Sequence, residues 1–130
     1  MVSKSPCVVD ASAIAAVIFD EPEAAPVMAS VGSSLVAPGL LRYEMASICA
    51  TKLTNAPKVA KLILQRYRLF NGLDIEFAEP DWDALPLLAR QWDLTAYDAA
   101  YLQLALKRGA PLVTLDARLA DAYDKAAARP

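Results

Sequence analysis

The amino-acid sequence predicts an α/β fold, a three-layer α/β/α arrangement in which a central parallel sheet of four or five strands lies between helices. Short apolar runs alternate with longer helical segments, which is the pattern of parallel strands joined by crossover helices. Acidic residues stand at several junctions between the two, at the sheet edge where α/β proteins bind ligands. Because the chain has 130 residues and no long linker, we expect residues 1–130 to form a single domain.

The N-terminal elements are a strand and two helices. Cys7–Val9 is a short apolar run and is predicted to be a buried strand. The segment after Asp10 is predicted to be a helix over Ser12–Phe19, and Pro22 suits the opening of a second helix over Glu21–Ser30.

A second strand and two long helices follow. Leu35–Ala37 is predicted to be the strand, which Pro38-Gly39 ends. Apolar residues recur at helical spacing over Leu40–Leu53. Pro57 fits the first turn of a further helix, Pro57–Phe70.

The C-terminal half repeats this alternation. Asp74–Phe77 alternates polar and apolar residues and is predicted to be the third strand. Helices are expected over Trp82–Trp92 and over Thr95–Gly109, where the glycine suits a C-cap. Leu112–Leu115 is predicted to be the fourth strand and Ala117–Ala127 the last helix.

Composition excludes several kinds of active site. The chain has no His, which excludes Ser–His and Cys–His catalytic pairs and His-ligated zinc. Cys7 and Cys49 are too far apart for a zinc-finger motif and are expected to be buried thiols. No glycine-rich nucleotide-binding motif occurs. The net charge of −2 argues neither for nor against a polyanionic partner.

The sequence does not predict a membrane protein. No stretch is long and apolar enough to span a bilayer. Lys4 precedes a mostly apolar run, but Asp10 in the middle of that run argues against a signal peptide. We therefore expect a cytoplasmic protein in a reducing compartment.

Four carboxylates are the strongest candidates for a functional site: Asp10, Glu44, Asp98 and Asp116. Asp10 and Asp116 follow predicted strands, and either could instead be only a helix N-cap. Asp98 fits a capping box that Thr95 begins. Glu44 falls on the apolar stripe of its helix, where a charged residue is rarely tolerated without a partner, and the nearest basic candidates are Arg42 and Lys52.

Taken together, the four acids predict a metal site. Clustered carboxylates repel one another, and a hard divalent cation removes that conflict. Mg²⁺ and Mn²⁺ prefer oxygen ligands and suit phosphate chemistry. Such a cation can activate a water molecule and stabilise charge on a phosphodiester.

The sequence resembles the PIN-domain ribonucleases, and most of all the VapC toxins of bacterial toxin–antitoxin pairs. The resemblance covers nearly the whole chain. It is carried by four motifs in order, Val8–Ala13, Ala37–Glu44, Leu94–Tyr101 and Leu112–Asp116. The acidic positions of the family match Asp10, Glu44, Asp98 and Asp116. Many relatives continue into a fifth strand, but Ala126–Pro130 has no strand signal here.

The resemblance implies an Mg²⁺- or Mn²⁺-dependent endoribonuclease that hydrolyses RNA with a metal-activated water. Asp10, Asp98 and Asp116 would bind the metal, and Glu44 would be a further ligand or would orient the water. Ser12, Thr95 and Thr114 would support the carboxylates through hydrogen bonds.

The resemblance also implies protein partners. It implies a homodimer, for which we expect the apolar segments around Met45-Cys49-Leu53 and Leu62-Ile63-Leu64 to supply surface. A cognate VapB-like antitoxin would form a higher assembly with it and would cover the acids. Because an acidic crevice suits a guanidinium group, we expect the antitoxin to insert an Arg or Lys there.

The basic residues give a weaker signal. Arg42 and a stripe formed by Lys58, Lys61 and Arg68 are candidates for RNA binding, although such a stripe is more often a solvated helix face. Three tyrosines are expected to pack in or near the core, with base stacking as the alternative: Tyr67, Tyr97 and Tyr101.

Two other functions are compatible with parts of the sequence. A phosphohydrolase could use Asp10 as a covalent nucleophile, but the haloacid dehalogenase-like enzymes need a second Asp where Ser12 stands. A non-catalytic nucleic-acid or protein-binding module on the same fold predicts the loss of at least one of the four acids, and none is lost.

Overall fold

The computed structural model describes residues 5–129 of the chain. Strands and helices alternate throughout this range, as the sequence predicts. In chain order the elements are β1 (Pro6–Val9), α1 (Ala11–Ile18), α2 (Ala24–Ser30), β2 (Ser34–Pro38), α3 (Leu40–Asn55), the 3-10 helix η1 (Pro57–Val59), α4 (Ala60–Asn71), β3 (Ile75–Ala78), α5 (Leu85–Trp92), α6 (Ala96–Arg108), β4 (Leu112–Val113) and α7 (Ala117–Ala127).

The four strands form one parallel sheet in the order β3-β2-β1-β4. The inner strand β1 pairs with the other inner strand, β2, and with the edge strand β4, and Val8 lies opposite Val36 of β2 and Leu112 of β4. The predicted fold class is thereby confirmed, with four strands in the part of the chain that the structure describes. Since the strands are parallel, their carboxyl ends lie at one edge of the sheet.

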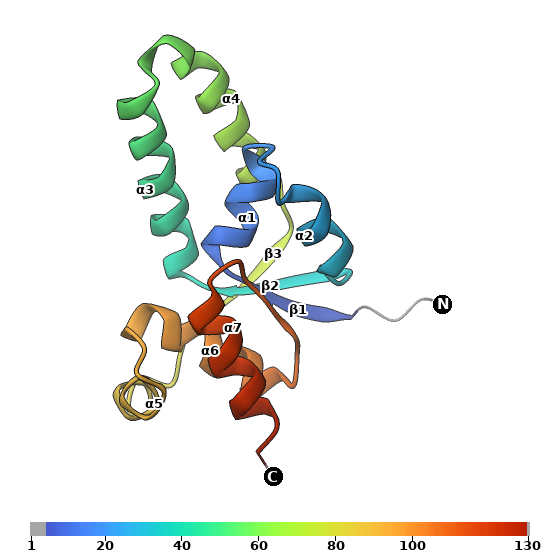
Figure 1. Ribbon diagram of the computed structural model, residues 1–130, viewed down its shortest axis with the longest axis vertical. Helices are drawn as coiled ribbons and strands as arrows, with labels where there is room; N and C mark the ends of the chain where they lie inside the picture. The colour runs from blue at the N-terminus through green and yellow to red at the C-terminus, as the bar shows by residue number, and fades with distance from the viewer. Residues whose placement is uncertain (1–4, 130) are drawn as a thin grey trace.

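Helices cover both faces of the sheet (Figure 1). Helices α1 to α4 lie on one face, where α3 and α4 form a long hairpin that projects away from the strands. Helices α5 to α7 lie on the other face, and α6 contacts β1, β2 and β4. Both α3 and α6 begin near the carboxyl edge of the sheet, which brings their first turns to the ends of β1 and β4.

The core lies between the sheet and these helices. Large side chains that are almost completely buried include Val8 of β1, Leu41 and Met45 of α3, and Tyr101 and Leu102 of α6. Both thiols are buried and free, as the sequence predicts. Helix α1 is rich in buried alanines, whose small side chains allow it to pack closely on its neighbours.

Two expectations from the sequence need correction. The helix predicted from Trp82 begins at Leu85, because the Asp81 carboxylate accepts the Asp83 and Ala84 N–H groups and forms a turn there. Trp82 is consequently 65% exposed. The fourth strand is Leu112–Val113 only. After it, the Leu115 N–H donates to the Ser12 hydroxyl instead of continuing the sheet.

The apolar surface expected to form a dimer is buried or half-buried within the single chain, except at Leu62. Met45, Cys49 and Ile63 are buried, whereas Leu62 is 54% exposed. Residues 5–129 therefore bury more apolar surface within one chain than a four-stranded sheet would suggest. Across residues 5–129, none of the helices combines the length and the apolar character needed to cross a membrane.

Candidate active site

Asp10 lies at the centre of the carboxyl edge, directly after β1, and is only 6% exposed. It is the N-cap of α1, because its Oδ1 accepts the Ala13 N–H at 3.1 Å. The same oxygen accepts the Ser12 hydroxyl at 2.7 Å, and the Thr114 hydroxyl donates to Oδ2. These hydrogen bonds compensate the carboxylate for the loss of water on burial.

Ser12 and Thr114 connect the ends of β1 and β4. The Ser12 hydroxyl oxygen accepts the Leu115 N–H at 2.9 Å, and the Thr114 hydroxyl oxygen accepts the Asp116 N–H at 3.0 Å. Each hydroxyl therefore donates to Asp10 and accepts from the segment that carries Asp116. Both hydroxyls make the hydrogen bonds to a carboxylate that the sequence predicts. Together they join Asp10 to a segment that lies more than 100 residues later in the chain.

Asp116 begins α7 in the way that Asp10 begins α1. Its Oδ1 accepts the Arg118 N–H at 2.9 Å and the Leu119 N–H at 3.3 Å. Among the described residues no hydrogen bond reaches its other oxygen, which remains available to a ligand. The N-cap interpretation of both strand-end acids is thus correct, but it does not occupy all of their lone pairs.

Glu44 is half-buried in α3, and its partner is Tyr101 of α6. The Tyr101 hydroxyl donates to Oε1 of Glu44 at 2.6 Å. The basic candidates lie elsewhere, since Lys52 pairs with Glu21 at 3.2 Å and Arg42 stacks on the Phe77 ring. Burial raises the pKa of the Glu44 carboxyl, as do the charges of nearby acids, and the bond from Tyr101 opposes the rise.

Tyr101 holds its proton firmly in this environment. Its ring is almost completely buried, and burial together with the Glu44 carboxylate raises the pKa of its hydroxyl far above the ordinary value. The hydroxyl is therefore a fixed hydrogen-bond donor that orients Glu44. No sequence pattern predicted this contact, because it joins residues on different helices.

Asp98 is half-buried in the first turn of α6. The Thr95 hydroxyl oxygen accepts the Asp98 N–H at 3.1 Å, so Thr95 caps the helix. The reciprocal bond of a capping box, from the Thr95 N–H to the Asp98 carboxylate, does not occur within the described residues. Thr95 therefore bonds only the backbone of Asp98, and the Asp98 carboxylate lines the crevice without a hydrogen bond from Thr95.

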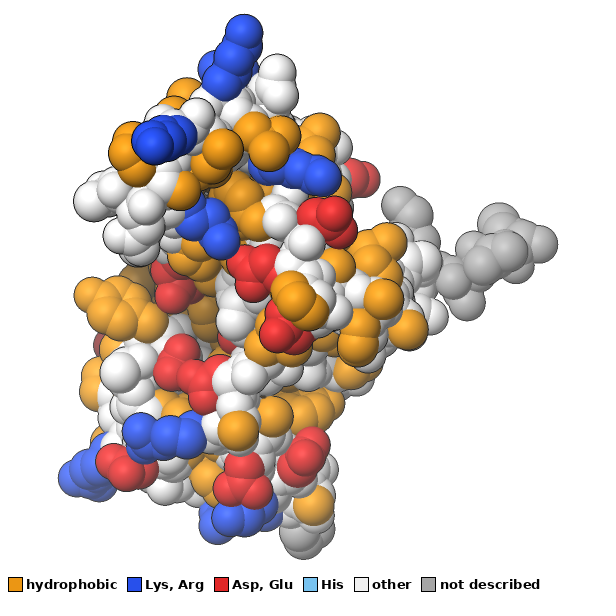
Figure 2. Space-filling model, turned by 45° about the horizontal axis from the view of Figure 1, so that its top comes forward, with side chains coloured by type: hydrophobic (Ala, Val, Ile, Leu, Met, Phe, Trp, Pro, Cys, Tyr) orange, Lys and Arg blue, Asp and Glu red, His pale blue; other side chains and the backbone are white. Residues whose placement is uncertain are grey.

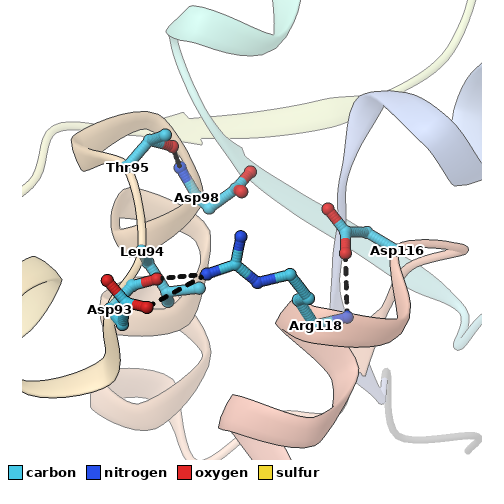
Figure 3. Close-up of a pocket in the computed structure, with 6 residues that line it drawn as sticks. All are labelled: Asp93, Leu94, Thr95, Asp98, Asp116 and Arg118. Atoms are coloured by element: carbon cyan, nitrogen blue, oxygen red, sulfur yellow. Dashed lines mark hydrogen bonds and ion pairs between the residues drawn. The ribbon is translucent and has the colours of Figure 1, made fainter.

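A hollow of about 310 Å³ lies in front of Asp98 and Asp116, and Arg118 extends into it (Figure 3). The Arg118 guanidinium donates to the backbone oxygen of Asp93 at 2.7 Å and lies 3.4 Å from its carboxylate. It points toward Asp98 as well. Arg118 was not predicted from the sequence; it lies in the first turn of α7, two residues after Asp116.

The four acids influence one another electrostatically. Burial raises the pKa of Asp98, and the charges of Asp116 and Asp10 raise it further, while Arg118 lowers it. Glu44 in turn experiences the charges of Asp10 and Asp98. Figure 2 shows acidic side chains around a hollow in the middle of this face, with basic side chains over the α3–α4 hairpin. All four predicted acids therefore gather at one edge of the sheet.

The donor chemistry of this edge suits a hard cation, but the acids do not form a closed cage. Among residues 5–129, no three Asp, Glu or Cys side chains are grouped so that they could hold a metal ion. Mg²⁺ needs only one or two carboxylates, because it keeps several waters and often binds substrate phosphates. The half-buried, mutually repelling carboxylates of Glu44 and Asp98 fit a cation held in that open manner.

The other predicted residues lie outside this cluster. Lys58 and Lys61 are exposed near the turn between α3 and α4, and eleven residues of helix, about 17 Å, separate Glu44 from the end of α3. Arg68 is exposed on α4. Of the three tyrosines, Tyr101 is buried and Tyr67 partly buried, but Tyr97 is 66% exposed and the prediction for it is wrong.

Comparison with known proteins gives three results. The model of the PIN domain family matches residues 7–125. Ribonuclease VapC3 from Pyrobaculum aerophilum is 35% identical over 123 residues, which span 89% of this chain and 93% of that protein. The crystal structure of PAE2754, from the same organism, aligns with a TM-score of 0.61 over 95% of this chain and 94% of that chain. At 21% identity, this last match supports the fold alone.

Proposed function

This chain belongs to the PIN domain family, as its motifs predict, and we propose that it is an endoribonuclease, the toxin of a toxin–antitoxin pair. The observation that carries the proposal is the gathering of Asp10, Glu44, Asp98 and Asp116 at the carboxyl edge of the sheet. The name of the similar Ribonuclease VapC3 supports RNA as the substrate.

We propose that Mg²⁺ or Mn²⁺ is the cofactor, held in this open manner by one or two carboxylates at a time from among Asp10, Asp98 and Asp116, with Glu44 beside them and water completing the coordination. When bound, such a cation supplies positive charge to the phosphodiester and acidifies a coordinated water. The free oxygen of Asp116 and the unbonded carboxylate of Asp98 face the hollow from which RNA would approach.

The residues of the chain contribute three further effects. Tyr101 holds the Glu44 carboxylate in one orientation, where it can accept a hydrogen bond from the attacking water. Ser12 and Thr114 fix Asp10 through its two oxygens. Arg118, already in the hollow, can turn from Asp93 to a phosphate oxygen of RNA, since the ion pair it would leave is exposed and weak.

Cleavage of RNA by the purified protein tests the proposal. We expect single-stranded RNA to be cut in the presence of Mg²⁺ or Mn²⁺ and to stay intact with a chelator. The matched control is Asp10→Asn, which nearly keeps the shape of the side chain. Cleavage that is unaffected by both the chelator and Asp10→Asn would contradict the proposed site.

We propose partners of the kind that the family implies. A VapB-like antitoxin would cover the acids, and an Arg or Lys of that protein would compete with the cation for the same oxygens. A homodimer would use the exposed apolar side chains of η1 and α4, which are Val59, Leu62 and Leu69. Basic residues on the same elements, Lys58, Lys61 and Arg68, would attract RNA at longer range. Light scattering tests the dimer, which a stable monomer at micromolar concentration would contradict.

A further inference from the structure

A second hollow, of about 480 Å³, lies beside the acidic edge and carries three exposed aromatic side chains. Tyr43 is 80% exposed, Trp82 is 65% exposed and Tyr97 is 66% exposed. They come from α3, from the turn before α5 and from the first turn of α6, so that three separate segments bring them to one place. Large aromatic rings gathered on a surface usually mark a binding site.

Two residues that line this hollow are the sequence neighbours of two of the carboxylates. Tyr43 directly precedes Glu44, and Tyr97 directly precedes Asp98. Because successive residues of an α-helix point about 100° apart, an acid that faces the crevice places the preceding tyrosine at its rim. The same Tyr–acid pair occurs on both helices that border the site. A ligand in the hollow would therefore lie next to a group held over the acids.

The hollow also offers one hydrogen-bond donor group and one acceptor group. Arg42 lines it, and the guanidinium carbon lies 3.9 Å from the centre of the Phe77 ring. Within residues 5–129 Arg42 makes no ion pair, and neither does Glu79, which also lines the hollow. A nucleobase has matching features, since its edge carries both acceptors and donors and its faces stack on aromatic rings and guanidinium planes.

We propose that this hollow binds an unpaired nucleobase of the RNA, adjacent to the phosphodiester that lies over the acids. The inference rests on the proposed function and adds to it that the substrate is single-stranded at this position. A volume of this size suits a small planar group better than a protein surface. Because any base can stack on an aromatic ring, the hollow would raise the affinity for RNA without selecting a sequence. It would also position the RNA strand relative to the cleaved bond.

Fluorescence of a short single-stranded RNA tests the inference without cleavage. One adenine is replaced by the fluorescent analogue aminopurine, and Asp10→Asn protein is used so that the RNA stays intact. Stacking should quench the fluorescence. Adding Trp82→Ala or Tyr97→Ala should remove the quenching and weaken RNA binding by about tenfold or more. Trp82→Phe and Tyr97→Phe keep a stacking face and should restore most of both.

Met28→Ala is the matched control, because Met28 is 57% exposed on α2, outside this hollow. Quenching and RNA affinity that are the same in the alanine variants as in the control would overturn the inference. It would also be overturned if Trp82→Ala left RNA affinity unchanged but dissociated a dimer or an antitoxin complex, since the surface would then be a protein interface. Cleavage by the wild-type protein is measured separately, so a failure of the nuclease proposal is distinguishable from a failure of this one.

Discussion

The two pairs of acids at the sheet edge are held in different ways. Asp10 and Asp116 follow strands, and both are helix N-caps whose oxygens accept backbone N–H groups. Glu44 and Asp98 lie near the starts of helices, Asp98 in the first turn of α6 and Glu44 in the second turn of α3. Glu44 accepts one hydrogen bond, from Tyr101, and the Asp98 carboxylate accepts none from the described residues.

Because of this difference, one pair of acids contributes to the stability of the fold and the other pair is more suited to binding a ligand. The strand-end acids contribute to stability because the backbone groups they cap would otherwise be unsatisfied. The helix-start acids oppose stability, because burial and mutual repulsion raise the pKa values of Glu44 and Asp98. A cation or a cationic side chain would relieve the second pair far more than the first.

The largest expected effects come from neutralising one acid of each pair. Asp10→Asn and Asp98→Asn should each lower RNA cleavage by about 10³-fold or more, because each removes a charge that would hold the cation. Their stabilities should diverge. Asp10→Asn loses a hydroxyl hydrogen bond and should cost about 1 kcal/mol, whereas Asp98→Asn relieves repulsion and should not destabilise the fold. Cleavage assays and urea unfolding measure the two effects.

Equal stability losses in the two variants would contradict this distinction. Unchanged cleavage by Asp98→Asn would mean that Asp98 only serves the start of α6. Unchanged cleavage by Asp10→Asn would mean that Asp10 serves only as the N-cap of α1.

The hydroxyls that fix Asp10 should matter less than the acids. Ser12→Ala or Thr114→Val should lower cleavage by about 10- to 100-fold, since each removes a hydrogen bond that orients the carboxylate. Each should also destabilise the protein by about 1 kcal/mol. Ser47→Ala, at an exposed position of α3, is the control. If both effects equalled those of the control, Asp10 would not depend on these hydroxyls.

Arg118 offers a smaller test of the electrostatic balance in the crevice. Arg118→Ala should reduce cleavage by about tenfold, mainly through weaker RNA binding, if its guanidinium contacts a phosphate. Lys125→Ala removes one positive charge from the same helix, where Lys125 pairs with Asp121, and is the control. Faster cleavage by Arg118→Ala would instead show that this arginine obstructs the acids, as an inserted antitoxin side chain would.

The sequence predicted the parts of the site that depend on local position. Asp10 and Asp116 could be found because a carboxylate after a buried strand lies at a defined edge of a parallel sheet. Glu44 could be found because its helix stripe is otherwise apolar. The fold class followed from the same alternation of short apolar runs with helical segments.

Other features required the packing of distant segments. The Tyr101–Glu44 bond joins residues 57 positions apart and depends on how α3 lies against α6. Arg118 reaches the crevice because Asp93, which ends α5 with a left-handed backbone, presents its oxygens there. Trp82 is exposed because a local Asp81 turn replaces the predicted helix start. Periodicity does not encode such contacts.

The smallest expected effect is a pH dependence of stability that belongs to the helix-start pair alone. Since the folded state raises the pKa values of Glu44 and Asp98 above their ordinary values of 4.5 and 3.8, it binds their protons more tightly than the unfolded chain does. Their contribution to stability is therefore greatest at low pH and is lost as pH rises through the raised pKa values.

The variant Glu44→Gln/Asp98→Asn should lack this loss. Relative to wild type it should gain stability between about pH 4 and pH 7, by less than about 1 kcal/mol because water screens half-buried groups. Urea unfolding at both pH values measures the difference, and Asp124→Asn, at an exposed position of α7, is the control. A difference that does not change with pH, or that changes as much for the control, would mean that folding does not place these two acids under electrostatic strain. The contrast between the two pairs would then rest on hydrogen bonding alone.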